Sequence, residues 1–126
     1  MKKNLILTIA MFSLFSCSSD DENNTDPIVG TWYLFSENNE EVSTCGQKNT
    51  MTFNENGTYS ETYYYTDESD NCVSGGGDEG NWSNKGKENY GLIPSLENTE
   101  GTTKIVFSDN NNTFTIIEDN IVYKRK

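Results

Sequence analysis

Apolar and polar residues alternate along the chain from Ile28 to its end, in short segments that are separated by turn residues. A period of two is typical of strands with one buried face, and no window shows the spacing of an amphipathic helix. Asn56-Gly57, Asp109–Asn112 and Asp119-Asn120 are turn sequences that join neighbouring segments. The pattern predicts eight strands, at residues 28–35, 49–54, 58–65, 80–83, 88–93, 103–108, 113–117 and 121–124.

Short connections between consecutive strands make them antiparallel neighbours. Closing such a meander removes its exposed edges. The predicted fold class is therefore all-β, an eight-stranded antiparallel up-and-down barrel. The residues expected to face its interior are Trp32, Leu34, Met51, Phe53, Tyr59, Tyr63, Tyr65, Trp82, Tyr90, Leu92, Ile105, Phe107, Phe114, Ile116, Ile121 and Tyr123.

The hairpin around Asn56-Gly57 allows two registers. A two-residue loop would pair Phe53 with Ser60, whereas a three-residue loop that ends in a left-handed Gly57 pairs Phe53 with Tyr59. The second register buries two rings together, so we predict it.

An eight-stranded barrel has an interior that is either filled by side chains or just wide enough for one small ligand. Tyr63, Tyr65 and Phe107 are the candidate lining residues of a mouth pocket; a solid core is the alternative. Glu61 falls on the same inner face in the chosen register. It is either a ligand anchor or, as we prefer, a residue that a bulge in the strand turns outward.

The beginning of the chain has the features of an export signal. Residues 4–16 are an apolar run behind Lys2 and Lys3, shorter than the roughly 20 residues that span a bilayer. Leu14-Phe15-Ser16-Cys17 resembles the lipobox of bacterial lipoproteins, which implies cleavage before Cys17 and lipid attachment to it. The domains expected are a signal peptide at 1–16, an acidic flexible tether at 17–27 and a barrel at 28–126.

The residues after Cys17 bear on location. Ser18 resembles an outer-membrane sorting signal. Ser19-Asp20-Asp21-Glu22 resembles the acidic signal that sends some lipoproteins to the cell surface, although a solvated linker has the same composition. We expect a protein that is lipid-anchored in the bacterial outer membrane, with surface exposure left open.

The chain has three cysteines, and a lipidated Cys17 leaves Cys45 and Cys72 in an oxidising compartment. A disulfide between them is expected there. Two free thiols or a metal site are the alternatives. A zinc site lacks its usual ligands, because the chain has no histidine and no C-x-x-C sequence.

The two ends of the domain carry a further pattern. Gly30-Thr31-Trp32 lies on the first strand and Arg125 just beyond the last, so that in a closed meander Arg125 can lie over the Trp32 indole. Together with the F-x-x-x-G-T-Y sequence that begins at Phe53, this set resembles the lipocalin-like domains of bacterial lipoproteins over Ile28–Lys126. The resemblance implies a calyx that is open at one end and holds small apolar molecules.

Charge and composition exclude several functions. The net charge is −11, and removal of residues 1–16 takes away two lysines and no acid, so nucleic acid is excluded as a partner. With no histidine and no serine beside a base, we expect no catalytic residue and no enzyme. The acidic, glycine-rich stretch 67–79 matches neither a calcium loop nor a phosphate loop. A solvated loop is expected there, and no metal or cofactor.

Two functions remain. The first is a monomeric, membrane-anchored lipocalin-like protein that binds a small apolar or amphiphilic ligand at the barrel mouth. The alternative is a non-enzymatic module of the cell envelope whose barrel is filled, and which acts through acidic loops at Asp67–Glu79 or Pro94–Gly101.

Overall fold

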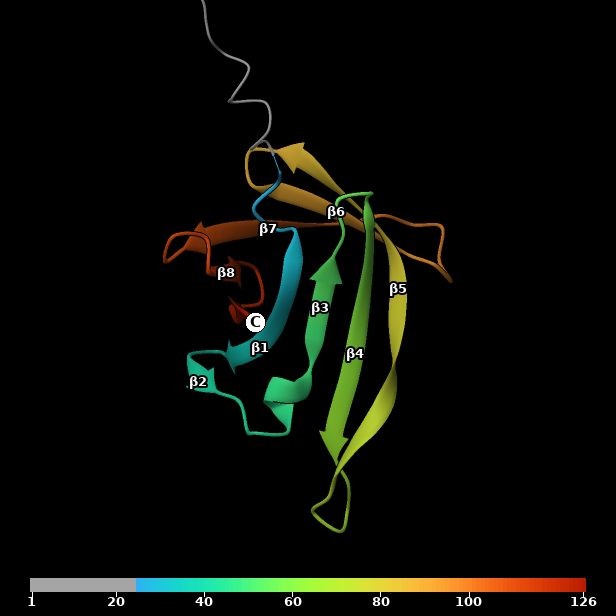
Figure 1. Ribbon diagram of the computed structural model, residues 1–126, viewed down its shortest axis with the longest axis vertical. Helices are drawn as coiled ribbons and strands as arrows, with labels where there is room; N and C mark the ends of the chain where they lie inside the picture. Colours follow the sequence, from blue (N-terminus) through green and yellow to red (C-terminus); the bar gives the residue numbers. More distant parts are fainter. Residues whose placement is uncertain (1–24) are drawn as a thin grey trace, which may run out of the picture.

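A computed structural model of the chain describes residues 25–126, and it confirms the predicted closed barrel (Figure 1). Each strand pairs with the next in antiparallel fashion, and β1 also pairs with β9, which closes the sheet. The eight barrel strands are β1 (Gly30–Glu37), β3 (Thr50–Phe53), β4 (Thr58–Thr66), β5 (Cys72–Gly86), β6 (Asn89–Pro94), β7 (Gly101–Ser108), β8 (Thr113–Ile116) and β9 (Ile121–Arg125). The lipobox, Cys17 and most of the predicted tether lie outside the described residues.

Two short elements lie between β1 and β3. The strand β2 (Glu40–Glu41) pairs only with β1, and the 3-10 turn η1 (Gly46–Lys48) leads into β3. In the part of the chain that the structure covers, no helix is long and apolar enough to cross a membrane.

The strand β5 differs most from its prediction, because it begins at Cys72 instead of Gly80. Residues 75–77 are glycines inside this strand, so the loop predicted at 67–79 is wrong for its second half. The segment is acidic and rich in glycine, a composition that disfavours strands and carries no apolar alternation. Its order comes from pairing with β4 over Cys72–Asn81. Figure 1 shows the resulting β4–β5 hairpin extending past the end of β3.

The hairpin between β3 and β4 has the predicted register. Phe53 pairs with Tyr59 and Met51 with Glu61, and Gly57 has a φ of 89°. This positive φ is the left-handed conformation that the three-residue loop requires.

Aromatic rings fill one part of the barrel interior. The Trp32 and Phe114 ring centroids are 4.7 Å apart at a steep angle, and Phe114 stacks on Tyr123 at 5.0 Å. The Trp32 indole N–H donates a 2.7 Å hydrogen bond to the Ile28 carbonyl, which satisfies the one polar atom of this buried ring. The aromatic residues of the core and those packed against it form what we call the ring cluster: Trp32, Phe53, Tyr59, Trp82, Tyr90, Phe107, Phe114 and Tyr123.

The packed part of the chain begins before Ile28. The Asp26 carboxylate accepts hydrogen bonds from the Tyr90 hydroxyl at 2.8 Å and from the Asn84 side-chain amide at 2.7 Å. Burial, and then this hydrogen bond to Asp26, raise the pKa of Tyr90. Asp26 and Pro27, which the sequence assigns to the tether, therefore contact the barrel.

Arg125 closes the barrel by joining its last strand to the residues before its first. The guanidinium lies 4.2 Å from the Trp32 ring, as predicted, and donates hydrogen bonds to the carbonyls of Val29 (3.0 Å), Pro27 (2.8 Å) and Asn111 (2.8 Å). Gly30 makes room for it: a β-carbon there would lie 2.6 Å from the Arg125 Nη1 atom. Position 30 must therefore be glycine because the Arg125 guanidinium packs directly against it.

We predict that Gly30→Ala lowers the free energy of unfolding by about 1–3 kcal/mol, because a φ of 135° strains alanine and its methyl group displaces the guanidinium. Urea denaturation measures the loss. Gly86→Ala is the matched control, since Gly86 also has a positive φ but a β-carbon there meets nothing within 4 Å. Gly30→Ala should cost more than this control, and the excess should disappear when Arg125→Ala is added. Equal costs for the two alanines would contradict the steric explanation.

Candidate functional site

A pocket of about 500 Å³ opens between β4, β6, β7 and the turn from β8 to β9. Tyr59, Leu92 and Ile116 form its apolar floor, and they belong to or pack against the core. We call this hollow the mouth pocket. Its other lining residues are mostly polar or acidic: Glu61, Pro94, Glu97, Thr99, Glu100, Gly101, Thr102, Thr103, Glu118 and Asp119.

Two smaller hollows adjoin it along the β4–β5 hairpin. One of about 420 Å³ is lined by Glu61, Gly77, Asp78, Glu79, Ser95 and Leu96. The other, of about 380 Å³, is lined by Glu61, Tyr63, Gly75, Gly77 and Asp78. Glu61 is common to all three hollows, so it stands at the centre of the candidate site.

Glu61 faces the interior because the strand is regular at this position. It pairs with Met51 on β3 and with Asp78 on β5, without a register shift at either pair. The shift comes two residues later, between Tyr63 and Tyr64, where the partner strand carries the extra residue. The prediction that a bulge turns Glu61 outward is therefore wrong. A bulge exists, but in β5 and beyond Glu61.

The surroundings of Glu61 are negatively charged. Burial raises the pKa of the Glu61 carboxyl, and the carboxylate of Asp78 directly across the strand pair raises it further. Burial, with smaller contributions from Glu61 and Glu37, raises the pKa of Tyr123 to about 12. The ion pairs found within residues 25–126 join Lys85 to Glu100 and Lys104 to Glu88, and neither involves Glu61.

The structure does not bring the three predicted lining rings together. Phe107 lies in the ring cluster, with its centroid 6.1 Å from that of Trp32 and 6.0 Å from that of Phe114. Tyr63 is 61% exposed and Tyr65 49% exposed, so both differ from the predicted interior positions. The long β4–β5 hairpin explains this, because its inner face beyond Glu61 extends past the neighbouring strands and has no opposite wall.

Of these rings, Tyr63 lines a hollow together with Glu61. The Tyr63 and Tyr65 rings both lie against Gly75, where a β-carbon would be 3.2 Å from each of them. The absence of a side chain at the bulge thus creates the space that the two rings occupy.

The pocket contains residues that the sequence did not single out. The alternation predicts that Leu92 and Ile116 face the interior, but nothing in it distinguishes a pocket floor from a solid core. The rim comes largely from Glu97–Gly101, within the acidic loop at 94–101 that the second functional hypothesis names, and from Glu118 and Asp119. Across residues 25–126, no group of three or more Cys, Asp or Glu side chains is arranged to hold a metal ion.

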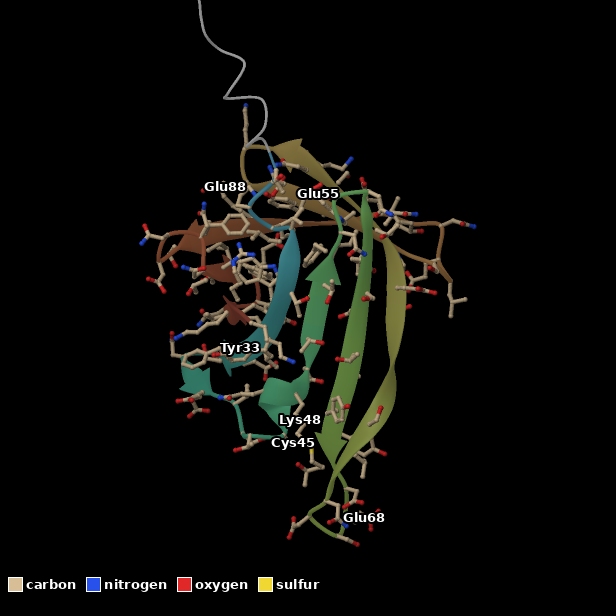
Figure 2. All side chains as sticks on the ribbon, in the orientation of Figure 1. Tyr33, Cys45, Lys48, Glu55, Glu68 and Glu88 are labelled. Atoms are coloured by element: carbon tan, nitrogen blue, oxygen red, sulfur yellow. A yellow bond between two sulfur atoms is a disulfide. The ribbon has the colours of Figure 1, made fainter. Side chains whose placement is uncertain are left out.

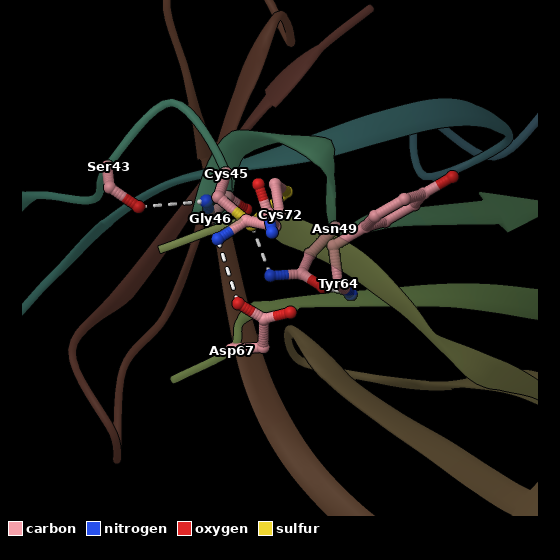
Figure 3. The surroundings of a disulfide bond; sticks show 8 residues. Ser43, Cys45, Gly46, Asn49, Tyr64, Asp67 and Cys72 are labelled. Atoms are coloured by element: carbon pink, nitrogen blue, oxygen red, sulfur yellow. Dashed lines mark hydrogen bonds between the residues drawn. A yellow bond between two sulfur atoms is a disulfide. The ribbon is translucent and has the colours of Figure 1, made fainter. Parts of the chain in front are cut away.

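The predicted disulfide between Cys45 and Cys72 is confirmed, with the two Cα atoms 5.5 Å apart (Figure 3). It joins the residue before η1 to the first residue of β5. Asn49 adds a second link, because its side-chain oxygen accepts a hydrogen bond from the Tyr64 backbone N–H. Closing a loop of this length stabilises the fold by about 3–4 kcal/mol in the chain-entropy estimate.

This disulfide fixes the part of the β4–β5 hairpin that lies beyond β3. Figure 2 shows Cys45 beside the lower part of the hairpin and Glu68 at its tip. Lys48, from η1, lies with its ammonium 5.7 Å from the centre of the Tyr64 ring, on the outer face. The disulfide and the contacts of Asn49 and Lys48 therefore fix the hairpin whose exposed inner face carries Tyr63 and Tyr65.

The family model of the lipocalin-like domain matches residues 28–118, which covers β1 to β8. Neither the curated proteins nor the solved structures contain a match to the chain.

We predict that Glu61→Gln stabilises the protein at about pH 8 and has no effect near pH 3. A raised carboxyl pKa favours folding at low pH, and this contribution is lost as the pH rises through the folded-state value. Glutamine stays neutral and escapes that loss. Thermal unfolding of both proteins across this pH range measures the difference.

Glu68→Gln is the control, since Glu68 lies exposed at the hairpin tip and its replacement should leave stability unchanged at both pH values. If Glu61→Gln is less stable than the parent at pH 8, the carboxylate makes favourable contacts there and the argument fails.

Proposed function

We propose that the barrel binds one small amphiphilic molecule in the mouth pocket. This chain belongs to the family of lipocalin-like domains, which supports a ligand-binding role. The observation that carries the proposal is the pocket itself, about 500 Å³ with an apolar floor and an acidic rim. This volume lies within the range of about 300–1,000 Å³ that is usual for small-molecule sites. The ring cluster below it limits the ligand to the outer part of the barrel.

The floor and the rim suit different parts of one ligand. An alkyl chain or ring that lies on Leu92 and Ile116 leaves water, which is favourable by roughly 25 cal/mol per Å² of apolar surface. Glu61, Glu97 and Asp119 then face the other end, and no lysine or arginine lines the pocket. We propose that this end carries a positive charge, with Glu61 as its anchor, since a cation would offset the charge that burial disfavours.

We also propose that the protein is anchored by lipid on Cys17 in the bacterial outer membrane and acts there as a monomer. The support is the lipobox, Leu14-Phe15-Ser16-Cys17, and the acidic linker that follows it. Two or more acyl chains would be required, because a single chain gives only marginal binding to a membrane.

The charge preference can be measured with two dansyl-labelled probes that have the same alkyl chain, one ending in a primary amine and one in a carboxylate. Residues 18–126 contain the whole described core and serve as the protein. We predict that the amine probe binds roughly tenfold more tightly at low salt, and that Glu61→Gln removes most of this preference. Fluorescence titration gives both affinities.

Glu68→Gln, with the same change of charge at the hairpin tip, should leave the preference intact. Native mass spectrometry of the same protein should reveal a bound molecule of lipid size. Equal affinity for the two probes would refute the cationic end, and failure of both probes to bind would refute the mouth pocket as a ligand site.

For the anchor, we predict that cells fed an alkyne-labelled fatty acid incorporate the label into the parent protein and not into Cys17→Ser, because the serine offers no thiol for the thioether. In-gel fluorescence after click labelling measures this, with Ser18→Ala as a control that keeps the label. Label retained on Cys17→Ser would place the lipid elsewhere.

A further inference from the structure

One side of β5 has no neighbouring strand along half of its length. This fifteen-residue strand pairs with β4 over Cys72–Asn81, but with β6 only over Gly80–Gly86. Along Val73–Glu79 no strand of residues 25–126 lies on the side away from β4. Residues 74–79 are all exposed. We call this stretch the open edge of β5.

One hydrogen bond shows which residues of the open edge direct their backbone N–H and C=O groups away from β4. The Ser95 N–H donates a 2.8 Å hydrogen bond to the Glu79 carbonyl, which shows that Glu79 faces away from β4. In an antiparallel ladder the groups of alternate residues point the same way. The N–H and C=O of Gly77 therefore also face outward, next to Glu79, as a donor and an acceptor that a further strand could use.

The open edge borders a groove in which few side chains would block an approaching strand. The hollow of about 420 Å³ extends from Gly77 to Leu96, which is 94% exposed. Gly75, Gly76 and Gly77 present no side chains, so another backbone can approach closely. Leu96 on one side and the exposed Tyr63 on the other offer apolar contacts for alternate side chains of such a strand.

The negative charge of the groove indicates which kind of strand can bind at the open edge. Glu61, Asp78 and Glu79 line it, and it has no lysine or arginine. A second copy of this chain would bring the same acids against themselves, and like charges directly opposite are destabilising. The acidic residues 18–24 of the chain itself carry the same sign. A segment rich in lysine or arginine is attracted instead.

We propose that the open edge of β5 binds an extended, basic segment of another protein, which adds to the barrel as one more strand. Main-chain hydrogen bonds at Gly77 provide the pairing, and the carboxylates of the groove select for basic side chains. This inference concerns the outer edge of the hairpin and does not depend on a ligand in the mouth pocket.

The probe is a capped peptide of alternating lysine and valine, added to ¹⁵N-labelled residues 18–126 at low salt. We expect amide shifts concentrated at Ser74–Glu79 and slower hydrogen exchange at the Gly77 amide. A peptide with N-methyl groups on every second residue has the same charge but cannot pair along one edge. It should bind about tenfold more weakly. A peptide of alternating glutamate and valine should not bind.

On the protein side, the double variant Asp78→Asn, Glu79→Gln should weaken binding of the lysine peptide severalfold. Asp109→Asn, an exposed acid in the turn after β7, should leave the affinity unchanged. Equal affinity for the methylated and unmethylated peptides would show that charge alone attracts them and would overturn the proposal. Shifts confined to the mouth pocket, or no binding at low salt, would overturn it as well.

Discussion

The contact between Arg125 and Trp32 is the constraint on which the barrel depends. One guanidinium covers the indole and satisfies carbonyls of Pro27, Val29 and Asn111, and so joins the residues before β1, the β7–β8 turn and the last strand. A meander closes only if its first and last strands are held in register, and here Trp32 pairs directly with Arg125. The ring cluster is assembled on the inner side of this same tryptophan. Barrel closure and core packing therefore meet at the same indole ring.

The molecule has a filled part and an open part, and strand length separates them. Trp32, Phe53 and Phe114 are fully buried where all the strands run alongside one another. Beyond Glu61 the β4–β5 hairpin continues alone, so inward positions there face water or a pocket. The glycine bulge and the disulfide are found in this part, where packing from an opposite wall is missing. The interior thus resembles neither a solid plug nor a full-depth calyx.

The alternation of apolar and polar residues was enough to predict the strand order, the Phe53–Tyr59 register and the place of Arg125 over Trp32. These depend on local pattern and on closure, which the sequence expresses directly. The extent of β5 could not be predicted, because Gly75–Gly77 are ordered by pairing with β4 and carry no pattern of their own. The same unpredicted length left Tyr63 and Tyr65 without a facing wall. The prediction for Glu61 is wrong because it places a bulge in the strand of Glu61 itself, whereas the structure has the bulge in the partner strand and two residues later.

The contacts of Asp26 and Pro27 have a mechanical consequence. A pull on the chain from its beginning meets Asp26, which is bound to Tyr90 on β6, and then Pro27, which is bound to Arg125 on β9, before it reaches β1. The load is therefore shared by strands from separate parts of the sheet before it reaches the ladder of β1. Peeling β1 away one hydrogen bond at a time would first require both side-chain contacts to break. An attachment of this kind resists tension by shear across the sheet.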